Sequence, residues 1–572
     1  MTDSRRARAV SALLALAALV WLRLPTNGIQ ILNVDEADFA VEAGVLLDGG
    51  RPYVDFVEKK PPLIYLLYAG ALAVVGRYNL PAFRLLLIGY VLASALVLAA
   101  IARRLYGEKV ALLAAPLYAV TVSVGLPMDV HAANPETLFL LPLLAGTYLW
   151  LQGKERAAGA GALLGLAALI KQQAGMQLPI LIAASWWERD RRRRIALLCA
   201  GFAAPWAVAL VGLAVAGSLG GFLYWTIGIN GYYISNGNSL ASSLRLGAGA
   251  VRLMAGFAPG VWLIGAGRLA YELFHPQARL PVVALWALGS LLPIALGGRF
   301  FPHYFLQLLP PLVLLASAGA VGLWDRMAAR SRLRMAGTIA TALLLVIAPA
   351  SRMTAFHDPE ALSVPHSMPP ARAIAAYVRE NTAPSARVLF WGYGSALYYL
   401  SERRPATRFP YVTYIVGAVE GTPYWWSPFH PRRPLEIPRA WDLFFEDLER
   451  HPPALFIDTA QPGYFGFYKF PPARYPRLQA FLDANYLRSE VAGAFQSGRG
   501  GSEALLRMSE QAGASLRSPM VDVVTGVLFL ASSESGRHLF QVRSIGSKRV
   551  RAWIRHRAHF LHKAMSPLPG IP

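Results

Sequence analysis

The chain alternates long apolar stretches with short polar loops through its first 350 residues. A helix needs about 20 mostly apolar residues to cross the hydrocarbon core of a bilayer, so each stretch is a candidate span. The candidates are Val10–Leu24, Leu85–Ala102, Val110–Leu126, Thr137–Leu151, Ala157–Ile170, Gly175–Trp187, Ile195–Gly217, Ala248–Gly267, Leu280–Leu296, Tyr304–Leu323 and Ala336–Ala350. Several fall short of that length and need interfacial residues or packing to complete them. The pattern predicts a mostly α-helical, polytopic membrane bundle of about 11 spans over residues 1–350.

One further apolar stretch, Pro61–Val75, decides the predicted topology. If it lies on the outer surface without spanning, nearly every dense basic cluster, including Arg191–Arg194, falls in a cytoplasmic loop. If it spans, Arg103–Arg104 moves outside and the later loops invert. Because basic residues concentrate in cytoplasmic loops, we favour the non-spanning topology, with Pro25–Arg84 as the first outer loop.

The pattern changes after residue 350, where helix-like and strand-like segments alternate. The expected helices are Arg372–Asn381, Arg439–Arg450 and Arg474–Asn485, and the expected strands are Arg387–Trp391, Ala454–Asp458 and Leu487–Val491. This alternation predicts a small α/β domain over residues 351–500, on the outer side in the favoured topology. Gly498–Ser502 is typical of a linker, and it leads into a basic tail, residues 501–572, that is a candidate for disorder.

Composition supports a membrane protein and argues against two other classes. Hydrophobic residues make up 55% of the chain and charged residues 15%, whereas soluble domains carry about 25% charged residues. The formal net charge of +22 comes largely from short basic runs between apolar spans. This distribution fits anionic lipid as the counter-charge and argues against nucleic acid. The one cysteine, Cys199, excludes an intramolecular disulfide and a cysteine-based metal cluster.

The first predicted outer loop carries many charges for a segment close to a bilayer. It contains Asp35 and Glu36 near its start, and Glu58, Lys59 and Lys60 directly before two prolines. Ionisable groups near a bilayer are costly and persist mainly where they line a wet cavity or act in function. Each residue also has a simpler reading. Asp35 suits a helix N-cap and Glu36 a helix first turn, and the lysines suit anchoring to lipid headgroups.

These residues resemble the first outer loop of GT-C glycosyltransferases that use polyprenyl-phosphate-linked sugars. The resemblance is strongest to the protein O-mannosyltransferase and lipid A aminoarabinose transferase group, whose members carry D-E near the start of this loop and E-K-P-P near its end. The extra lysine here leaves the family lysine open between Lys59 and Lys60. The resemblance implies juxtamembrane helices on the outer face and Asp35 as catalytic base with Glu36 as helper. It also implies that the lysines bind phosphate and that Glu58 takes part in metal binding.

Three later segments match the same group in order. Glu136 matches an acidic residue at a helix start after proline, and Lys171 matches a lysine turn. Arg299, His303 and Tyr304 lie in a stretch similar to R-[FY]-x-P-H-Y-[FL]-Q-x-L-P. The resemblance assigns all five to substrate binding, and an arginine fork suits phosphate. Simpler interpretations exist. Glu136 could complement a helix dipole, Lys171 could be a snorkelling lysine, and Tyr304 could belong to an interfacial aromatic belt.

Together these features predict a glycosyltransferase in the cytoplasmic membrane. It would move a sugar from a polyprenyl-phosphate donor to a lipid, glycan or protein acceptor on the outer face. Membrane lipid is an expected partner and nucleic acid is not. No cofactor is required by the sequence, and a divalent metal stays open. The alternative is a lipid or polysaccharide transporter, although transporters tend to show internal repeats and charges near the bilayer midplane. A membrane anchor with an outer binding domain is a second alternative, but it has no need of Asp35, Glu36 or Arg299.

Overall fold

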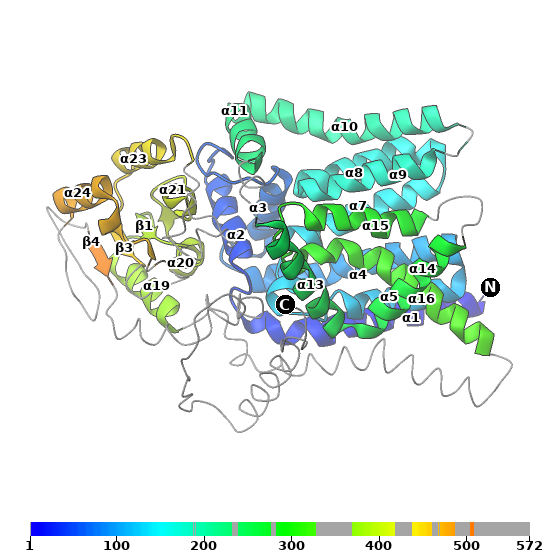
Figure 1. Cartoon of the computed structure of the whole chain (residues 1–572). Coiled ribbons are helices and arrows are strands. Elements are labelled where there is room, and N and C mark those ends of the chain that lie inside the picture. Colours follow the sequence, from blue (N-terminus) through cyan, green and yellow to red (C-terminus); the bar gives the residue numbers. More distant parts are fainter. Residues whose placement is uncertain are drawn as a thin grey trace, which may run out of the picture. The chain divides into compact units, whose positions relative to one another are not determined.

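The protein is described by a computed structural model for residues 2–186, 188, 190–231, 238–275, 282–327, 369–417, 437–459, 467, 469–486 and 504–507. The chain divides into two compact units, Met1–Gly526 and Val527–Pro572, and every described residue belongs to the first. This unit contains a helical part and a small parallel sheet with its own helices (Figure 1). The predicted span Ala336–Ala350 lies outside the described residues, and so does the predicted tail apart from residues 504–507.

Among the described residues, four helical segments are long and apolar enough to cross a membrane, and the chain is a multi-pass membrane protein. They are Ser4–Gly28, Leu80–Tyr106, Arg191–Val215 and Pro302–Arg326. The first contains α1 (Thr2–Arg23) and η1 (Leu24–Gly28), the next two are α4 and α10, and the last combines η5 (Pro302–Leu308) with α16 (Leu309–Met327). The total of about 11 spans stays a prediction.

Shorter helices occupy most of the other predicted spans. They are α5 (Glu108–Thr121), α7 (Pro135–Leu151), α8 (Ala157–Ile170), α9 (Gln177–Ser185) and α15 (Val282–Ala295). Short segments connect them: α6 (Pro127–Val130), η2 (Lys154–Arg156), η3 (Gln172–Met176), α11 (Leu219–Phe222) and η4 (Leu223–Gly228).

The predicted span over Ala248–Gly267 is not one straight helix. The structure has two helices there, α13 (Leu240–Phe257) and α14 (Pro259–Phe274), which meet at a bend of 112°. Pro259 has no N–H to continue the hydrogen bonding of α13, and its ring clashes with a helical residue before it, so the first helix ends at that point.

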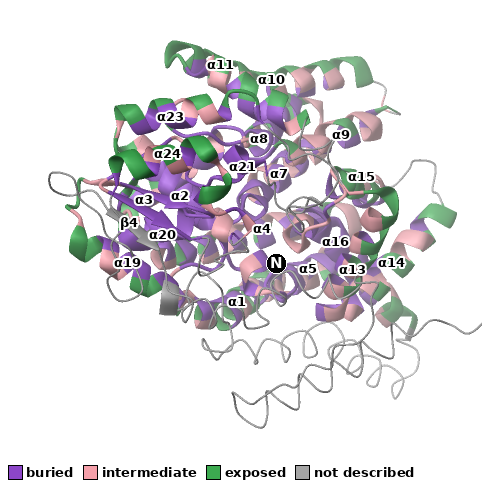
Figure 2. Ribbon diagram, turned by 60° about the vertical axis from the view of Figure 1, so that its left-hand side comes forward, coloured by how far each residue is buried: buried purple, intermediate pink, exposed green. Residues whose placement is uncertain are grey.

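Close helix contacts in the helical part depend on glycine. A Cβ at Gly161 of α8 would lie 2.0 Å from the carbonyl oxygen of Leu198, and one at Gly201 of α10 would lie 2.0 Å from that of Ala158. Small residues let helix backbones approach closely in membrane proteins. The far side of α10 is exposed (Figure 2), with Val208 at 74% and Val215 at 85% exposure. An exposed apolar face of this kind suits contact with lipid.

The segment between α1 and α4 forms two helices, α2 (Val34–Leu47) and α3 (Leu63–Val75). The 13 residues of α3 span about 20 Å at 1.5 Å per residue, which is shorter than a hydrocarbon core of about 30 Å. The helices α5, α8, α9 and α15 are also shorter than this core, so length does not decide whether α3 spans, and the non-spanning topology stays a prediction. The helix α2 begins at Val34, because the side chain of Asn33 accepts the N–H of Asp35 and caps the helix.

The predicted α/β domain has a four-stranded parallel sheet in the order β2-β1-β3-β4. Its strands are β1 (Arg387–Trp391), β2 (Arg404–Pro405), β3 (Leu455–Asp458) and β4 (Ala504–Arg507). Its helices are α19 (Pro369–Asn381), α20 (Ser395–Ser401), α21 (Thr413–Val416), α23 (Ala440–Arg450), η10 (Pro472–Arg474) and α24 (Pro476–Asn485). The sheet continues past the expected boundary at residue 500, and Leu487–Val491 lies outside the described residues.

This α/β domain packs directly on the segment that holds α2 and α3. The hydroxyl of Tyr399 accepts the N–H of Leu80 at 2.9 Å, and the N–H of Val57 donates to the carbonyl of Arg408 at 3.0 Å. An ion pair of 2.9 Å joins Arg404 to Asp48. The domain therefore supports the charged loop that the sequence singled out.

Candidate active site

Asp35 lies in the first turn of α2, with its carboxylate directed toward Lys60. Because Asn33 takes the cap position, Asp35 is not the N-cap of this helix. Its Oδ2 lies 4.0 Å from Nζ of Lys60, which also lies 3.6 Å from Oε1 of Glu58. The ammonium sits 4.6 Å from the ring centroid of Phe39, a cation–π contact. Lys60 thus links two carboxylates that are 23 positions apart in the printed sequence.

The backbone of the two lysines is held from several sides. Four side chains donate to their carbonyls: Tyr53 (2.7 Å) and Tyr65 (3.2 Å) to Lys60, and Gln172 (2.9 Å) and Asn230 (3.0 Å) to Lys59. The donors come from three separate parts of the helical region. Such support fixes the position of a loop that would otherwise be mobile, as precise chemistry requires.

Glu58 is buried and interacts with protein groups. It accepts the N–H of Lys59 at 2.7 Å, lies close to Lys60, and accepts the hydroxyl of Tyr411 from the α/β domain. Among the described residues there is no group of three or more His, Cys, Asp or Glu side chains placed to hold a metal ion. The contacts of Glu58 therefore point to orientation of Lys60.

Glu36, the neighbour of Asp35, lies in a different environment. Its carboxylate is fully buried and forms a 2.7 Å ion pair with Arg84 of α4. It also accepts the N–H groups of Leu32 at 2.5 Å and Ala133 at 3.2 Å. Arg84 in turn donates to the carbonyl of Ile29. These contacts tie three segments together and favour a positioning role over the predicted catalytic one.

Glu136, Lys171 and Tyr304 come together as one group. The ammonium of Lys171 pairs with the buried carboxylate of Glu136 and lies 4.2 Å from the ring centroid of Tyr304. The three residues come from the start of α7, the end of α8 and η5. The aromatic-belt and snorkelling readings do not account for this pairing, because both charges are mostly buried.

His303 belongs to a second acid–base pair at the same place. Its Nδ1 lies 3.0 Å from Oδ1 of Asp129, and its ring stacks on Phe301 with 5.6 Å between the ring centroids. His131 does not join this group, since its ring nitrogens contact Thr26 and the carbonyl of Ser123.

Arg299 is buried in a backbone segment of unusual conformation. Gly297, Gly298 and Phe300 all have positive φ, with Phe300 at 52°. A bulky non-glycine residue in this region is an outlier that persists where the surrounding structure imposes it, and such residues cluster at functional sites. The segment places the charge of Arg299 close enough to influence both Lys59 and Tyr304.

The electrostatics join these groups into one cluster, which we call the charged cluster: Asp35, Glu58, Lys59, Lys60, Glu136, Lys171, Arg299, His303 and Tyr304. Burial raises the pKa of Asp35, but the positive charges of Lys60, His303, Lys171 and Lys59 outweigh it and hold this pKa below its usual value. Burial lowers the pKa of Lys59 to about 8; Glu58 opposes this, and Lys60 and Arg299 add to it. Asp35 is therefore ionised at neutral pH.

Deeper on α2, two carboxylates behave in the opposite way. Burial, with nearby Asp35 and Glu58, raises the pKa of Asp38 well above its usual value, and burial with Glu58 and Asp38 does the same for Glu42. Both side chains are almost fully buried. Of the carboxylates on this helix face, Asp35 is thus the one that keeps its charge next to the lysines.

Comparison with known proteins points to one family over part of the chain. Residues 59–219 match the family model described as dolichyl-phosphate-mannose-protein mannosyltransferase. This match covers both lysines of the loop, Glu136 and Lys171. No curated protein matches it by sequence.

Solved structures show a fold similar to that of this chain. ArnT from Cupriavidus metallidurans bound to undecaprenyl phosphate is 16% identical, with a TM-score of 0.52 over 69% of this chain and 84% of that chain. ArnT from the same organism in the apo state gives 16% identity, the same coverage and a TM-score of 0.50. The oligosaccharyltransferase of Archaeoglobus fulgidus in the apo form is 13% identical, with a TM-score of 0.50 over 70% of this chain and 64% of that chain.

Sequence reasoning missed several residues of this site. Asp129 has no role in the sequence prediction, and in the structure it pairs with His303. Arg84 could have been found from the sequence, because it is a lone arginine at the start of a long apolar helix. Tyr411 gave none, since it lies 353 positions from its partner Glu58.

Proposed function

We propose that this protein is a glycosyltransferase that moves a sugar from a polyprenyl-phosphate donor to an acceptor on the outer face of the cytoplasmic membrane. The charged cluster and the α/β domain would both lie on that outer face. One observation carries the proposal. An ionised and partly exposed carboxylate, Asp35, lies among cations contributed by three separate parts of the chain.

Asp35 would act as the general base. Transfer requires removal of a proton from the acceptor hydroxyl, and a side chain within hydrogen-bond reach supplies this. An ionised carboxylate accepts that proton, and the ammonium of Lys60 at 4.0 Å holds it in place. Asp35 is also partly exposed, with 27% of its side chain accessible, whereas Glu36 is fully buried. An acceptor can therefore approach Asp35 and not Glu36.

Lys59, Lys60 and Arg299 would bind the phosphate of the donor. Preorganised cations stabilise the negative charge that develops on a leaving phosphate. Lys60 is already engaged by two carboxylates, so its main role would be to position them. Lys59 and Arg299 lie close enough to each other that the charge of the arginine lowers the pKa of the lysine. A phosphate between two such cations offsets their repulsion, which supports this pair as the main phosphate site.

The remaining groups of the cluster would bind the sugar. Glu136 with Lys171, and Asp129 with His303, present paired polar groups beside the ring of Tyr304. Paired donors and acceptors suit sugar hydroxyls, and an aromatic ring suits the apolar face of a sugar. The family description supports a lipid-phosphate donor, as does the undecaprenyl phosphate bound to ArnT. The acceptor would be a lipid, a glycan or a protein.

The transporter alternative would draw support from a broken helix at a binding site. The structure has such a break between α13 and α14. The residues around it are Gly256, Phe257, Ala258, Pro259 and Gly260, which carry no ionisable group. Because a transporter site at a broken helix uses the helix ends together with polar ligands, this break does not favour transport.

Reconstituted liposomes test the proposal directly. Purified protein would be assayed with a radiolabelled polyprenyl-phosphate sugar and with lipid, glycan and protein acceptors in parallel. The expected result is transfer to one acceptor class that is lost in Arg299→Gln and kept in the exposed control Arg450→Gln. If donor lipid crosses the bilayer while no acceptor is ever labelled, the transporter is correct.

A further inference from the structure

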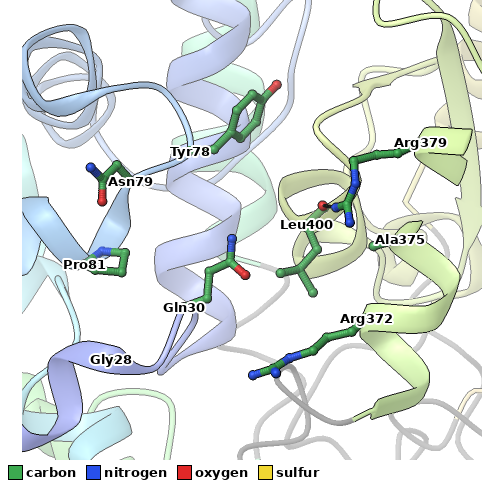
Figure 3. Close-up of a pocket in the computed structure, with 9 residues that line it drawn as sticks. All are labelled: Gly28, Gln30, Tyr78, Asn79, Pro81, Arg372, Ala375, Arg379 and Leu400. Carbon is green, nitrogen blue, oxygen red and sulfur yellow. Dashed lines mark hydrogen bonds between the residues drawn. The ribbon is translucent and has the colours of Figure 1, made fainter. Parts of the chain in front are cut away.

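A second polar cavity lies apart from the charged cluster. It has a volume of about 490 Å³. It is formed between α19, the segment that follows α1 and the segment that precedes α4 (Figure 3). Gly28 and Gln30 line it from one segment, Tyr78 and Asn79 from another, and Leu400 from α20. None of its lining residues belongs to the charged cluster. It is large enough for the polar headgroup of a lipid, within the usual range for ligand cavities.

The charge of this cavity is positive. Arg372 and Arg379 line it from α19, and no described residue of its lining carries a carboxylate. Figure 3 shows Arg372 extending from α19 toward Gly28 and Gln30. Arg379 donates to the carbonyl of Leu400, which fixes its guanidinium at the cavity wall. Arginine forks suit phosphate oxygens, and the amide groups of Gln30 and Asn79 add neutral donors.

The cavity lies at the ends of two candidate spans. Gly28 is the last residue of one span, and Asn79 directly precedes another that begins at Leu80. Arg84, near the start of that second span, donates to the carbonyl of Ile29 directly after Gly28, so the two ends are adjacent. The N-terminus of the long helix α4 adds partial positive charge here, since Asn79 is its N-cap.

Apolar side chains next to the cavity suit the acyl chains of the same ligand. Leu24, in the same short helix as Gly28, is 48% exposed, and Val74, four residues before Tyr78, is 81% exposed. A free phosphate ion needs no apolar surface, whereas the acyl chains of a lipid require one. This combination of cations, span ends and exposed apolar side chains favours a lipid over a soluble anion.

We propose that this cavity binds the phosphate headgroup of an anionic membrane lipid, separately from the donor site. The lipid would fill the space between α19 and the first segment of the membrane part. Arg84 connects this cavity to the charged cluster. It donates to the carbonyl of Ile29, which lies between Gly28 and Gln30, and it pairs with Glu36 beside Asp35. Lipid at this cavity would therefore stabilise the segment that carries Asp35.

Binding of a short-chain phosphatidylglycerol to the purified full chain, followed by native mass spectrometry, tests this proposal. Arg372→Gln and Gln30→Ala alter opposite walls of the cavity, and both are expected to weaken binding by about tenfold, as for loss of one charge-assisted contact. The control Arg450→Gln removes an exposed arginine from α23, outside the cavity, and is expected to bind normally. The readout requires no transfer activity, so it is independent of the proposed function.

Three arms identify the ligand and the site. Phosphatidylglycerol should bind more tightly than phosphatidylcholine, and inorganic phosphate should not compete at millimolar concentration. The proposal is overturned if Arg372→Gln binds phosphatidylglycerol as well as Arg450→Gln does. It is also overturned if inorganic phosphate displaces the lipid, or if Lys59→Gln rather than Arg372→Gln abolishes binding, since the lipid would then occupy the donor site.

Discussion

Two neighbouring carboxylates at the start of α2 lie in regions of opposite character. Glu36 is fully buried, pairs with Arg84 at 2.7 Å and accepts two backbone N–H groups. Asp35 is partly exposed and lies 4.0 Å from Lys60, within a group of cations. In the first region, an arginine and two backbone N–H groups fully pair the carboxylate of Glu36. In the second region, the carboxylate of Asp35 stays accessible to a substrate. A fully satisfied carboxylate holds structure, whereas a loosely paired one is placed for chemistry.

Asp35→Asn is the sharpest way to break this comparison and has the largest expected effect. The amide cannot accept the proton of an acceptor, so turnover should fall by about 10²–10⁴-fold. Donor affinity should stay within about threefold, because the phosphate cations remain. Steady-state kinetics with a radiolabelled donor measures both. Turnover within tenfold of the unaltered protein would remove Asp35 from the mechanism.

Glu36→Gln should have its effect on stability. Removing one partner of a buried ion pair costs about 3–5 kcal/mol, because the other charge is left uncompensated. Thermal unfolding in detergent should show a lower midpoint, and Glu36→Gln with Arg84→Gln should recover part of the loss. A single variant as stable as the unaltered protein, but inactive, would instead make Glu36 a catalytic residue.

Lys59→Gln should weaken donor binding by about 10–100-fold, as expected for a lost charge-assisted contact of about 1.5–3 kcal/mol. Turnover at saturating donor should change much less. The apparent affinity for the donor, measured by titration, separates the two. An unchanged affinity would leave Lys60 and Arg299 as the phosphate ligands.

The pH dependence of the reaction should show an alkaline limb only. The pKa of Lys59 is lowered to about 8, so its charge is present below that pH and is lost as the pH rises through it. The pKa of Asp35 is lower than usual, so the base stays ionised down to acidic pH. Donor affinity should fall severalfold between pH 7 and pH 9. In Lys59→Arg this limb should disappear, since arginine keeps its charge; a limb that persists belongs to another group.

Lys109→Ala should have the smallest effect of these variants. It tests an exposed ion pair as the counterpart of the buried pair of Glu36. Lys109 pairs with Asp325 at 2.7 Å, but both side chains are largely exposed. Exposed pairs add little to stability. The unfolding midpoint and the transfer rate should both be unchanged. A clear loss of stability would mean that ion-pair burial is not what separates Glu36 from the rest.

Much of the fold was predictable because its signals are local. The strand Arg387–Trp391 follows from a short-range pattern, and it lies where the sequence indicated. The bend at Pro259 was missed, since an apolar stretch reads as continuous when hydropathy alone is counted. The number of spans stays a prediction because several helices are too short to decide by length.

The site was predictable where a family pattern marked it and not where contacts join distant segments. Asp35, Lys59 and Lys60 lie in one loop, so their proximity was expected. The pairs Arg84–Glu36, Asp129–His303 and Glu58–Tyr411 are 48, 174 and 353 positions apart. No local pattern relates such residues, because their approach depends on the packing of whole helices and of the α/β domain.

The position of a bound donor tests the central claim most directly. A cryo-electron microscopy structure of the purified protein with a polyprenyl phosphate would locate the phosphate. The account predicts density within ion-pair distance of Lys59 and Arg299, with the carboxylate of Asp35 facing the same space. Phosphate bound away from these residues, with Asp35 turned toward protein alone, would contradict it.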